Sequence, residues 1–300
     1  MPQAPADLPD YPFTGVRLEV CPGVRLHCLD EGPRDAPVVV MVHGNPTWSF
    51  YFRRLVLSLR DRYRCIVPDH VGMGLSDRPT DRAYPYRLAQ RVADLTRVIN
   101  TLSPRGPISL VLHDWGGMIG MGWATAQAQR VRAMAVMNTA AFHLPPGAKM
   151  PWQLRLSRGP HGATLVRGFN GFCRYALRHC MARSVMPPEV RRGYLMPYGD
   201  WAARRAVHRF VQDIPLDPRH PSHETVTRIG AGLPALSRVP MLLPWGLRDF
   251  VFNEAYLRAW RERFPDAVAL PMADVGHYVL EDAWEEVGPA IASFLDRHHR

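Results

Sequence analysis

The sequence lacks most of the features that mark membrane, secreted or metal-binding proteins. No apolar run approaches the roughly 18 residues that a membrane-spanning helix needs, and the first twelve residues are proline-rich without a basic segment followed by an apolar one. The five cysteines form no CxxC pair, which argues against a zinc site and a disulfide framework. We therefore expect an unprocessed cytoplasmic protein with reduced cysteines and with no metal or other cofactor.

Size and charge indicate one catalytic domain with an inserted basic lobe. The chain has 300 residues, of which 47% are hydrophobic and 21% charged, enough for a large core. The segment from Ala141 to Gly230 contains 14 basic residues, Lys149 and 13 arginines, and only five acidic ones. The rest of the chain contains 23 basic and 22 acidic residues. Such a lobe suits an acidic partner protein or an anionic membrane surface, and a solvated arginine-rich face is the simpler interpretation. No nucleic-acid-binding motif accompanies it, so we expect no nucleic acid partner.

Short apolar runs alternate with segments of helical periodicity, which predicts a doubly wound α/β sheet. The expected buried parallel strands are Val38 to Val42, Cys65 to Val67, Ile108 to Leu112, Ala133 to Met137, Met241 to Leu243 and Ala267 to Leu270. The expected helices are Phe52 to Leu59, Leu88 to Leu102, Tyr256 to Phe264 and Ala283 to Leu295. Upstream, two runs that flank Pro22-Gly23 predict an antiparallel hairpin at one edge of the sheet.

The alternation stops between about residues 143 and 233, where the sequence becomes helical, aromatic and rich in proline and arginine. We interpret residues 143–233 as a helical cap inserted into a core made of residues 1–142 and 234–300. This order of elements predicts a mostly parallel sheet with an inserted helical cap.

The segment Leu110-Val111-Leu112-His113-Asp114-Trp115-Gly116-Gly117 combines an apolar strand, a sharp turn and a small-residue helix start. This is the pattern of a nucleophile elbow, here with a carboxylate at the turn. The positive end of the helix would keep Asp114 ionised. An aspartate that only caps a helix fits this motif alone equally well.

Two later residues favour the catalytic interpretation. Asp249 follows the strand run that ends near Gly246, and His277 lies in Val275-Gly276-His277-Tyr278 after the final strand. The chain order nucleophile, acid, histidine is the order of an α/β-hydrolase triad, in which Asp249 would orient the imidazole of His277. Three such residues at three strand ends are not expected by chance.

The loop His43-Gly44-Asn45-Pro46-Thr47-Trp48 follows the strand Val38 to Val42, where this fold forms an oxyanion hole from backbone N–H groups. The side-chain amide of Asn45 and the indole N–H of Trp115 together provide donors for a departing anion. Two weaker patterns are interpreted as structural: Gly72-Met73-Gly74 as a turn, and Asp69-His70 as a pair without further metal ligands.

These motifs resemble the haloalkane dehalogenase group of the α/β-hydrolase superfamily, whose signatures match His43 to Trp48, Asp69 to Asp77 and His113 to Gly117. Within that group, four further segments are similar to the β-lactone decarboxylases of bacterial long-chain olefin biosynthesis: Asn138 to Phe142, Met150 to Gln153, Gln212 to Leu216 and His277 to Asp282. The resemblance runs from about Tyr11 to Leu295. It implies Asp114 as nucleophile, Asp249 as acid, His277 as histidine, and Asn45 with Trp115 as the clamp of the leaving anion.

The resemblance implies decarboxylation of a cis-2,3-dialkyl β-lactone to a cis alkene and CO2 through a covalent Asp114 intermediate. The lactone substrate would be long-chain and hydrophobic, and attack at either the alkyl or the carbonyl carbon stays open. The alternative is a haloalkane dehalogenase, in which His277 activates water to hydrolyse the Asp114 ester. An epoxide hydrolase, which would use cap tyrosines such as Tyr175, Tyr194 and Tyr198, ranks third, and a catalytically silent binding protein ranks last because the triad is complete.

Overall fold

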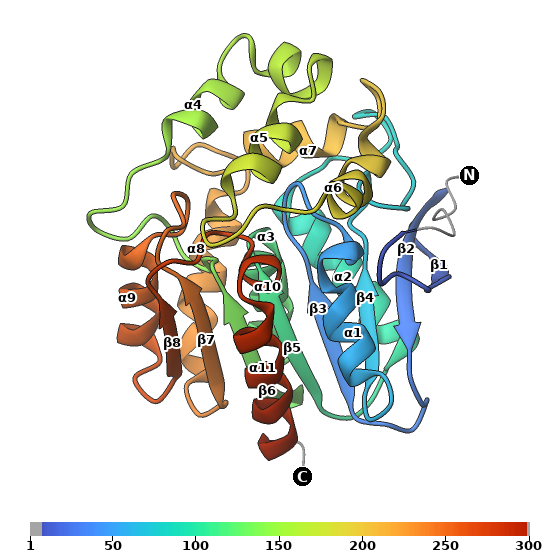
Figure 1. The fold of residues 1–300 in the computed structure, drawn as a ribbon, viewed down its shortest axis with the longest axis vertical. Coiled ribbons are helices and arrows are strands. Elements are labelled where there is room, and N and C mark those ends of the chain that lie inside the picture. Colours follow the sequence, from blue (N-terminus) through green and yellow to red (C-terminus); the bar gives the residue numbers. More distant parts are fainter. Residues whose placement is uncertain (1–7, 299–300) are drawn as a thin grey trace.

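The computed structural model describes residues 8–298 and contains an eight-stranded, mostly parallel sheet with helices on both faces (Figure 1). The strand order is β1-β2-β4-β3-β5-β6-β7-β8, in which β1 and β2 form the predicted antiparallel hairpin and β2 also pairs antiparallel with β4. The other neighbours are parallel. The strands are β1 Val16–Cys21, β2 Val24–Glu31, β3 Val38–Val42, β4 Arg64–Pro68, β5 Ile108–His113, β6 Val131–Met137, β7 Met241–Gly246 and β8 Val268–Met272.

Successive side chains of the central strands pack alternately into two hydrophobic cores, one on each face of the sheet. Val38, Val40 and Val42 of β3 belong to one core, and Val39 and Met41 to the other, as the two-residue period of a strand requires. Helices α1 and α11 cover the face that is in front in Figure 1, and α2, α3, α8 and α9 pack on the other core. Their bounds are α1 Arg53–Leu59, α2 Leu88–Leu102, α3 Trp115–Ala126, α8 His223–Gly232, α9 Glu254–Arg263 and α11 Trp284–His298.

The segment between β6 and β7 contains helices joined by loops and no strand, and most of it lies beyond one end of the sheet (Figure 1). That part contains the helices α4 Trp152–Arg158, α5 Gly171–His179, α6 Pro188–Leu195 and α7 Arg205–Gln212, with the short turns η3 Thr164–Gly168 and η4 Met196–Tyr198. The last helix, α8, instead packs beside α3, where Ile229 lies next to Gly122. We propose that residues 143–233 form the inserted cap, with α8 as the part that returns to the core.

One strand differs from the sequence prediction. The run Ala267 to Leu270 was expected to be a buried strand, but β8 is the edge strand of the sheet and Val268 is 57% exposed. This prediction was wrong because an apolar run reveals a strand without revealing whether a neighbour covers both of its sides. Within residues 8–298, no helix has both the length and the apolar character needed to cross a bilayer.

Candidate active site

Asp114 occupies a sharp turn between β5 and α3. Its φ of +52° and ψ of −128° lie in a backbone region that residues with a side chain rarely adopt, at a typical cost of about 1–3 kcal/mol. The helix that follows the turn, α3, passes close to β3. Gly116 allows this approach, because a Cβ at that position would lie only 1.8 Å from the carbonyl oxygen of Val42. The strained turn therefore presents the Asp114 carboxylate at the amino end of a twelve-residue helix.

One oxygen of this carboxylate is held by backbone donors. Asp114 Oδ1 accepts a hydrogen bond of 2.6 Å from the backbone N–H of Asn45, and the backbone N–H of Trp115 also donates to the carboxylate. Gly44 permits this approach, because a Cβ there would lie 2.0 Å from Asp114 Oδ1. Burial raises the pKa of Asp114, although His277 and these two N–H groups act in the opposite direction.

His277 lies between two carboxylates. Its Nδ1 is 2.7 Å from Asp249 Oδ2, and its Nε2 is 3.6 Å from Asp114 Oδ2. Burial alone would lower the pKa of His277, but the two carboxylates outweigh it, so the pKa is raised above its ordinary value. The structure thus brings together Asp114, His277 and Asp249, the three residues that the sequence placed at separate strand ends. Asp114 Oδ2 is the oxygen paired with His277, whereas Oδ1 accepts from the N–H of Asn45.

Asn138, directly after β6, contacts Asp249 and was not among the site residues predicted from the sequence. Its Nδ2 donates to Asp249 Oδ2 at 2.9 Å and to the carbonyl of Gly246 at 3.0 Å, while its Oδ1 accepts from the N–H of Gly246 at 2.8 Å. The N–H of Val251 completes the binding of Asp249 at 2.7 Å. Asn138 therefore joins two neighbouring strand ends and orients Asp249 toward His277.

His113, directly before Asp114, holds the loop that carries His277. Its Nε2 is 2.8 Å from the carbonyl oxygen of His277, and its ring stacks on Tyr51 with centroids 4.4 Å apart. Burial keeps the pKa of His113 well below its ordinary value, so the ring is neutral and its Nε2–H donates to that carbonyl. The sequence offered one signal for this role, a polar residue at the end of an apolar strand.

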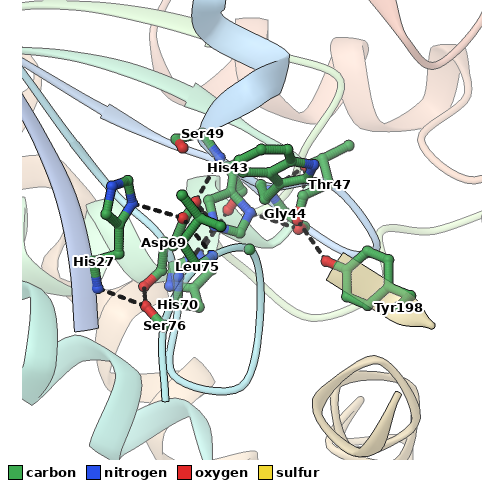
Figure 2. Close-up of polar contacts among 12 residues, drawn as sticks. His27, His43, Gly44, Thr47, Ser49, Asp69, His70, Leu75, Ser76 and Tyr198 are labelled. Carbon is green, nitrogen blue, oxygen red and sulfur yellow. Dashed lines mark hydrogen bonds and ion pairs between the residues drawn. The ribbon is translucent and has the colours of Figure 1, made fainter. Parts of the chain in front are cut away.

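A buried polar network supports the loop that supplies the Asn45 N–H. Figure 2 shows Asp69 within it, where one oxygen accepts from the N–H of Ser49 at 2.6 Å and the other is 2.9 Å from His27 Nδ1. His43 donates from Nδ1 to the carbonyl of Gly44, and burial lowers its pKa to about 4. These contacts agree with a structural role for Asp69 in holding the loop against the sheet.

The two side chains expected to clamp an anion both line the cavity beside Asp114. Asn45 Nδ2 donates to the carbonyl of Val207 in α7 at 3.1 Å, which leaves its second N–H. Trp115 packs its ring against Phe210 of the same helix, with centroids 5.3 Å apart. The cap therefore orients both donors, and their role as a clamp remains a proposal.

The cavity above Asp114 has a volume of about 280 Å³ and an apolar lining from both core and cap. His277 also borders it. Its apolar lining includes Met118, Phe142, Leu154, Phe172, Val211 and Ile214. Apart from Asp114, His277 and Asn45, few polar side chains line it, which suits a hydrophobic ligand that is fixed at one end. Among residues 8–298, no cluster of three or more His, Cys, Asp or Glu side chains is arranged to hold a metal ion.

Comparison with known proteins agrees with this architecture. Residues 37–283 match the α/β hydrolase fold family. The chain is 46% identical to a cis-3-alkyl-4-alkyloxetan-2-one decarboxylase of Xanthomonas campestris pv. campestris, over 97% of this chain and 98% of that protein. It is also 46% identical to the protein of the same name from Shewanella oneidensis, over 91% and 86% of the two chains. Haloalkane dehalogenase 2 of Mycobacterium bovis is 31% identical over 94% of each chain.

Solved structures show the same fold. The crystal structure of the haloalkane dehalogenase DbeA from Bradyrhizobium elkani superposes with a TM-score of 0.83 over 96% of this chain and 99% of that chain, at 24% identity. At that level of identity the likeness concerns the fold alone.

Proposed function

The chain belongs to the α/β-hydrolase fold family, and we propose that it is a cis-3-alkyl-4-alkyloxetan-2-one decarboxylase, converting a cis-2,3-dialkyl β-lactone to a cis alkene and CO2. The decarboxylases share 46% of its residues over nearly the whole chain, against 31% for the haloalkane dehalogenase. The observation that carries the chemistry is a buried carboxylate that lines an apolar cavity, with its Oδ1 held by the backbone N–H of Asn45 and its Oδ2 beside His277.

We propose that Asp114 Oδ2 attacks the ring carbon that bears the ring oxygen. The bond between these ring atoms breaks, and the freed substrate carboxylate is held by the side-chain N–H groups of Asn45 and Trp115. The electrons of the bond to CO2 then form the alkene and expel Asp114 as a carboxylate. Inversion at the attacked carbon followed by anti elimination retains the cis arrangement, and no water is consumed.

In this mechanism His277 acts mainly through its charge. Its raised pKa and its position between Asp249 and Asp114 favour an imidazolium, which stabilises Asp114 each time that group returns as an anion. The positioning of His277 by Asp249, Asn138 and His113 sets this charge close to the reacting oxygen.

The alternative is a haloalkane dehalogenase that uses the same residues. There, His277 would deprotonate a water that attacks the ester carbonyl of Asp114, while the Asn45 and Trp115 donors hold a halide. The triad geometry is compatible with both reactions, so the choice between them rests on sequence similarity and is tested by the experiment below.

An epoxide hydrolase is disfavoured by where the cap tyrosines point. The hydroxyl of Tyr194 donates to Glu281 at 2.6 Å, and that of Tyr198 donates to the carbonyl of Thr47 at 3.2 Å. Neither residue lines the cavity, and the hydroxyl of Tyr175, which does, is 2.7 Å from Gln153 Nε2. Of the three cap tyrosines that such a reaction would call on, only Tyr175 therefore lines the cavity.

The test offers the purified protein a cis-dialkyl β-lactone and a haloalkane in separate reactions. Alkene with CO2 is the expected outcome, and alcohol with halide would identify the dehalogenase. A single turnover in heavy-oxygen water should leave Asp114 unlabelled, because label in the Asp114 peptide requires ester hydrolysis. Asp114→Asn should abolish both reactions, and His277→Ala should trap an alkyl-enzyme only if the hydrolytic mechanism operates.

We further propose that the basic cap binds an acidic partner enzyme of the same reaction sequence or a membrane surface, in a cytoplasmic protein. The charge excess of residues 141–230 supports an electrostatic contact, which should weaken as ionic strength rises.

A further inference from the structure

The mouth of the substrate cavity is rimmed by large apolar side chains that remain exposed. Leu144, Trp152 and Leu156 line the cavity and are nevertheless 39%, 65% and 51% exposed. Each of these side chains therefore reaches from the cavity into solvent. Isolated exposed apolar residues are common, but a group of three at the entrance of a cavity marks an interaction site.

The exposed apolar side chains concentrate in the cap. Of the eight exposed large hydrophobic residues in the described part of the chain, seven lie between Leu144 and Leu216. Only Val268, in β8, lies outside the cap. Figure 1 shows α4, which carries Trp152 and Leu156, at the outer edge of the cap, away from the sheet. The rim therefore faces outward, where another surface can reach it.

The segment of chain that carries this rim has charge of one sign. Between Ala141 and His179 the chain has six basic residues and no acidic one. Lys149 and Arg155 are exposed beside Trp152 and Leu156. Aromatic and aliphatic side chains flanked by Lys and Arg are the composition with which proteins bind the interface of an anionic bilayer.

We propose that this rim, formed by Leu144, Lys149, Trp152, Arg155 and Leu156, docks the cavity mouth onto an anionic lipid bilayer. The inference rests on the proposed function, because a lactone with two alkyl chains partitions into lipid and would enter the cavity from there. The apolar side chains would insert below the headgroups while the two cations bind lipid phosphates. Docking would thus let the substrate pass between bilayer and cavity without crossing water.

Cosedimentation with extruded vesicles tests the proposal without relying on activity. The wild-type protein should bind phosphatidylglycerol vesicles at least about tenfold more tightly than phosphatidylcholine vesicles, and high salt should weaken that binding. Reversal of both charges in Lys149→Glu/Arg155→Glu should reduce binding by about 25-fold or more, since each basic residue near such a surface typically contributes about fivefold. Trp152→Ser/Leu156→Ser should also reduce binding to vesicles.

The matched control is Arg97→Glu/Arg238→Glu, which changes the net charge equally at exposed positions outside the cap and should bind like the wild type. Equal loss in the two charge-reversed proteins, or no preference for anionic vesicles, would overturn the proposal. Binding to soluble polyglutamate but not to vesicles would also overturn it, in favour of an acidic protein partner.

An activity comparison separates this inference from the proposed function. Lys149→Glu/Arg155→Glu should decarboxylate a short-chain, water-soluble cis β-lactone at the wild-type rate, because neither residue lines the cavity. The same variant should be at least about tenfold slower on a long-chain lactone embedded in anionic vesicles. If the wild type produces no alkene from the soluble lactone, the proposed function fails, whatever the vesicle-binding result.

Discussion

Replacing Gly44 with alanine tests the geometry of the proposed nucleophile, Asp114, directly. The added Cβ would lie 2.0 Å from Asp114 Oδ1, which is about 1 Å closer than real Cβ contacts come. The backbone of Gly44 is not in the left-handed region, so alanine introduces no torsional strain and acts only through this clash. The carboxylate must move away from the N–H of Asn45, which now donates to it at 2.6 Å.

The expected effect of Gly44→Ala is a large loss of activity together with a loss of stability, because the added Cβ would also lie 2.3 Å from the Cβ of Asp114. A misplacement of about 1 Å at a reacting group costs roughly 10²-fold in rate, and the loss of one oxyanion-type donor costs about 10² to 10³. Both arise from the same displacement, so we expect a decrease in kcat of about 10² to 10³ and not the product of the two.

The assay measures kcat for alkene release together with the melting temperature. Gly199→Ala is the control for adding a methyl group, because a Cβ at this position meets nothing within 4 Å and its φ of −68° suits alanine. If Gly44→Ala kept activity within about fivefold of the wild type while Gly199→Ala behaved normally, the contact between the Asn45 N–H and Asp114 would have no part in the reaction.

Three further perturbations are predicted. Asn138→Ala removes a donor to Asp249 and should lower kcat by about 10- to 100-fold with KM nearly unchanged, measured by steady-state kinetics; an unchanged kcat would exclude the orienting role. Arg91→Met should leave the melting temperature unchanged or higher, because the fully buried guanidinium has no hydrogen-bond partner among the described residues and stacks 3.4 Å over Phe210; a marked drop would reveal a stabilising partner. Acidification from pH 6.5 to 5 should lower the melting temperature, because buried histidines with lowered pKa resist a protonation that the unfolded chain accepts, by up to about 1.4 kcal/mol per pH unit for each group. The buried histidines with a lowered pKa are His43, His70, His113 and His208. His277, whose pKa is raised, acts in the opposite direction, and a rise in melting temperature on acidification would contradict this prediction.

The elements and the turn that holds Asp114 were predictable because their signals are local. The helix expected over Leu88 to Leu102 is α2, residue for residue, since its apolar spacing and flanking segments depend only on neighbours in the chain. Asp114 was recognisable for the same reason, because a strand, a turn and glycines follow one another within eight residues. The prediction that Asp249 and His277 form a triad with Asp114 came from their order in the chain combined with the expected fold.

The contacts that orient these residues were not predictable in the same way. Asn138 reaches Asp249 across 111 positions of sequence, and Asn45 reaches Val207 of the cap across 162. Neither pair carries a pattern that a single sequence displays. The edge position of β8 was missed for a related reason, because its exposure depends on which strand lies beside it.

The sequence by itself determined the alternation of strands and helices, the helical insert and the carboxylate at the turn after β5, since hydrophobic period and turn chemistry act over a few residues. Only the tertiary structure decided which oxygen of Asp114 is held and which faces His277, and which side chains support them. Hydrogen bonds form only when donor and acceptor lie within about 3 Å, and between distant segments that separation is set by the packing of the whole sheet and cap.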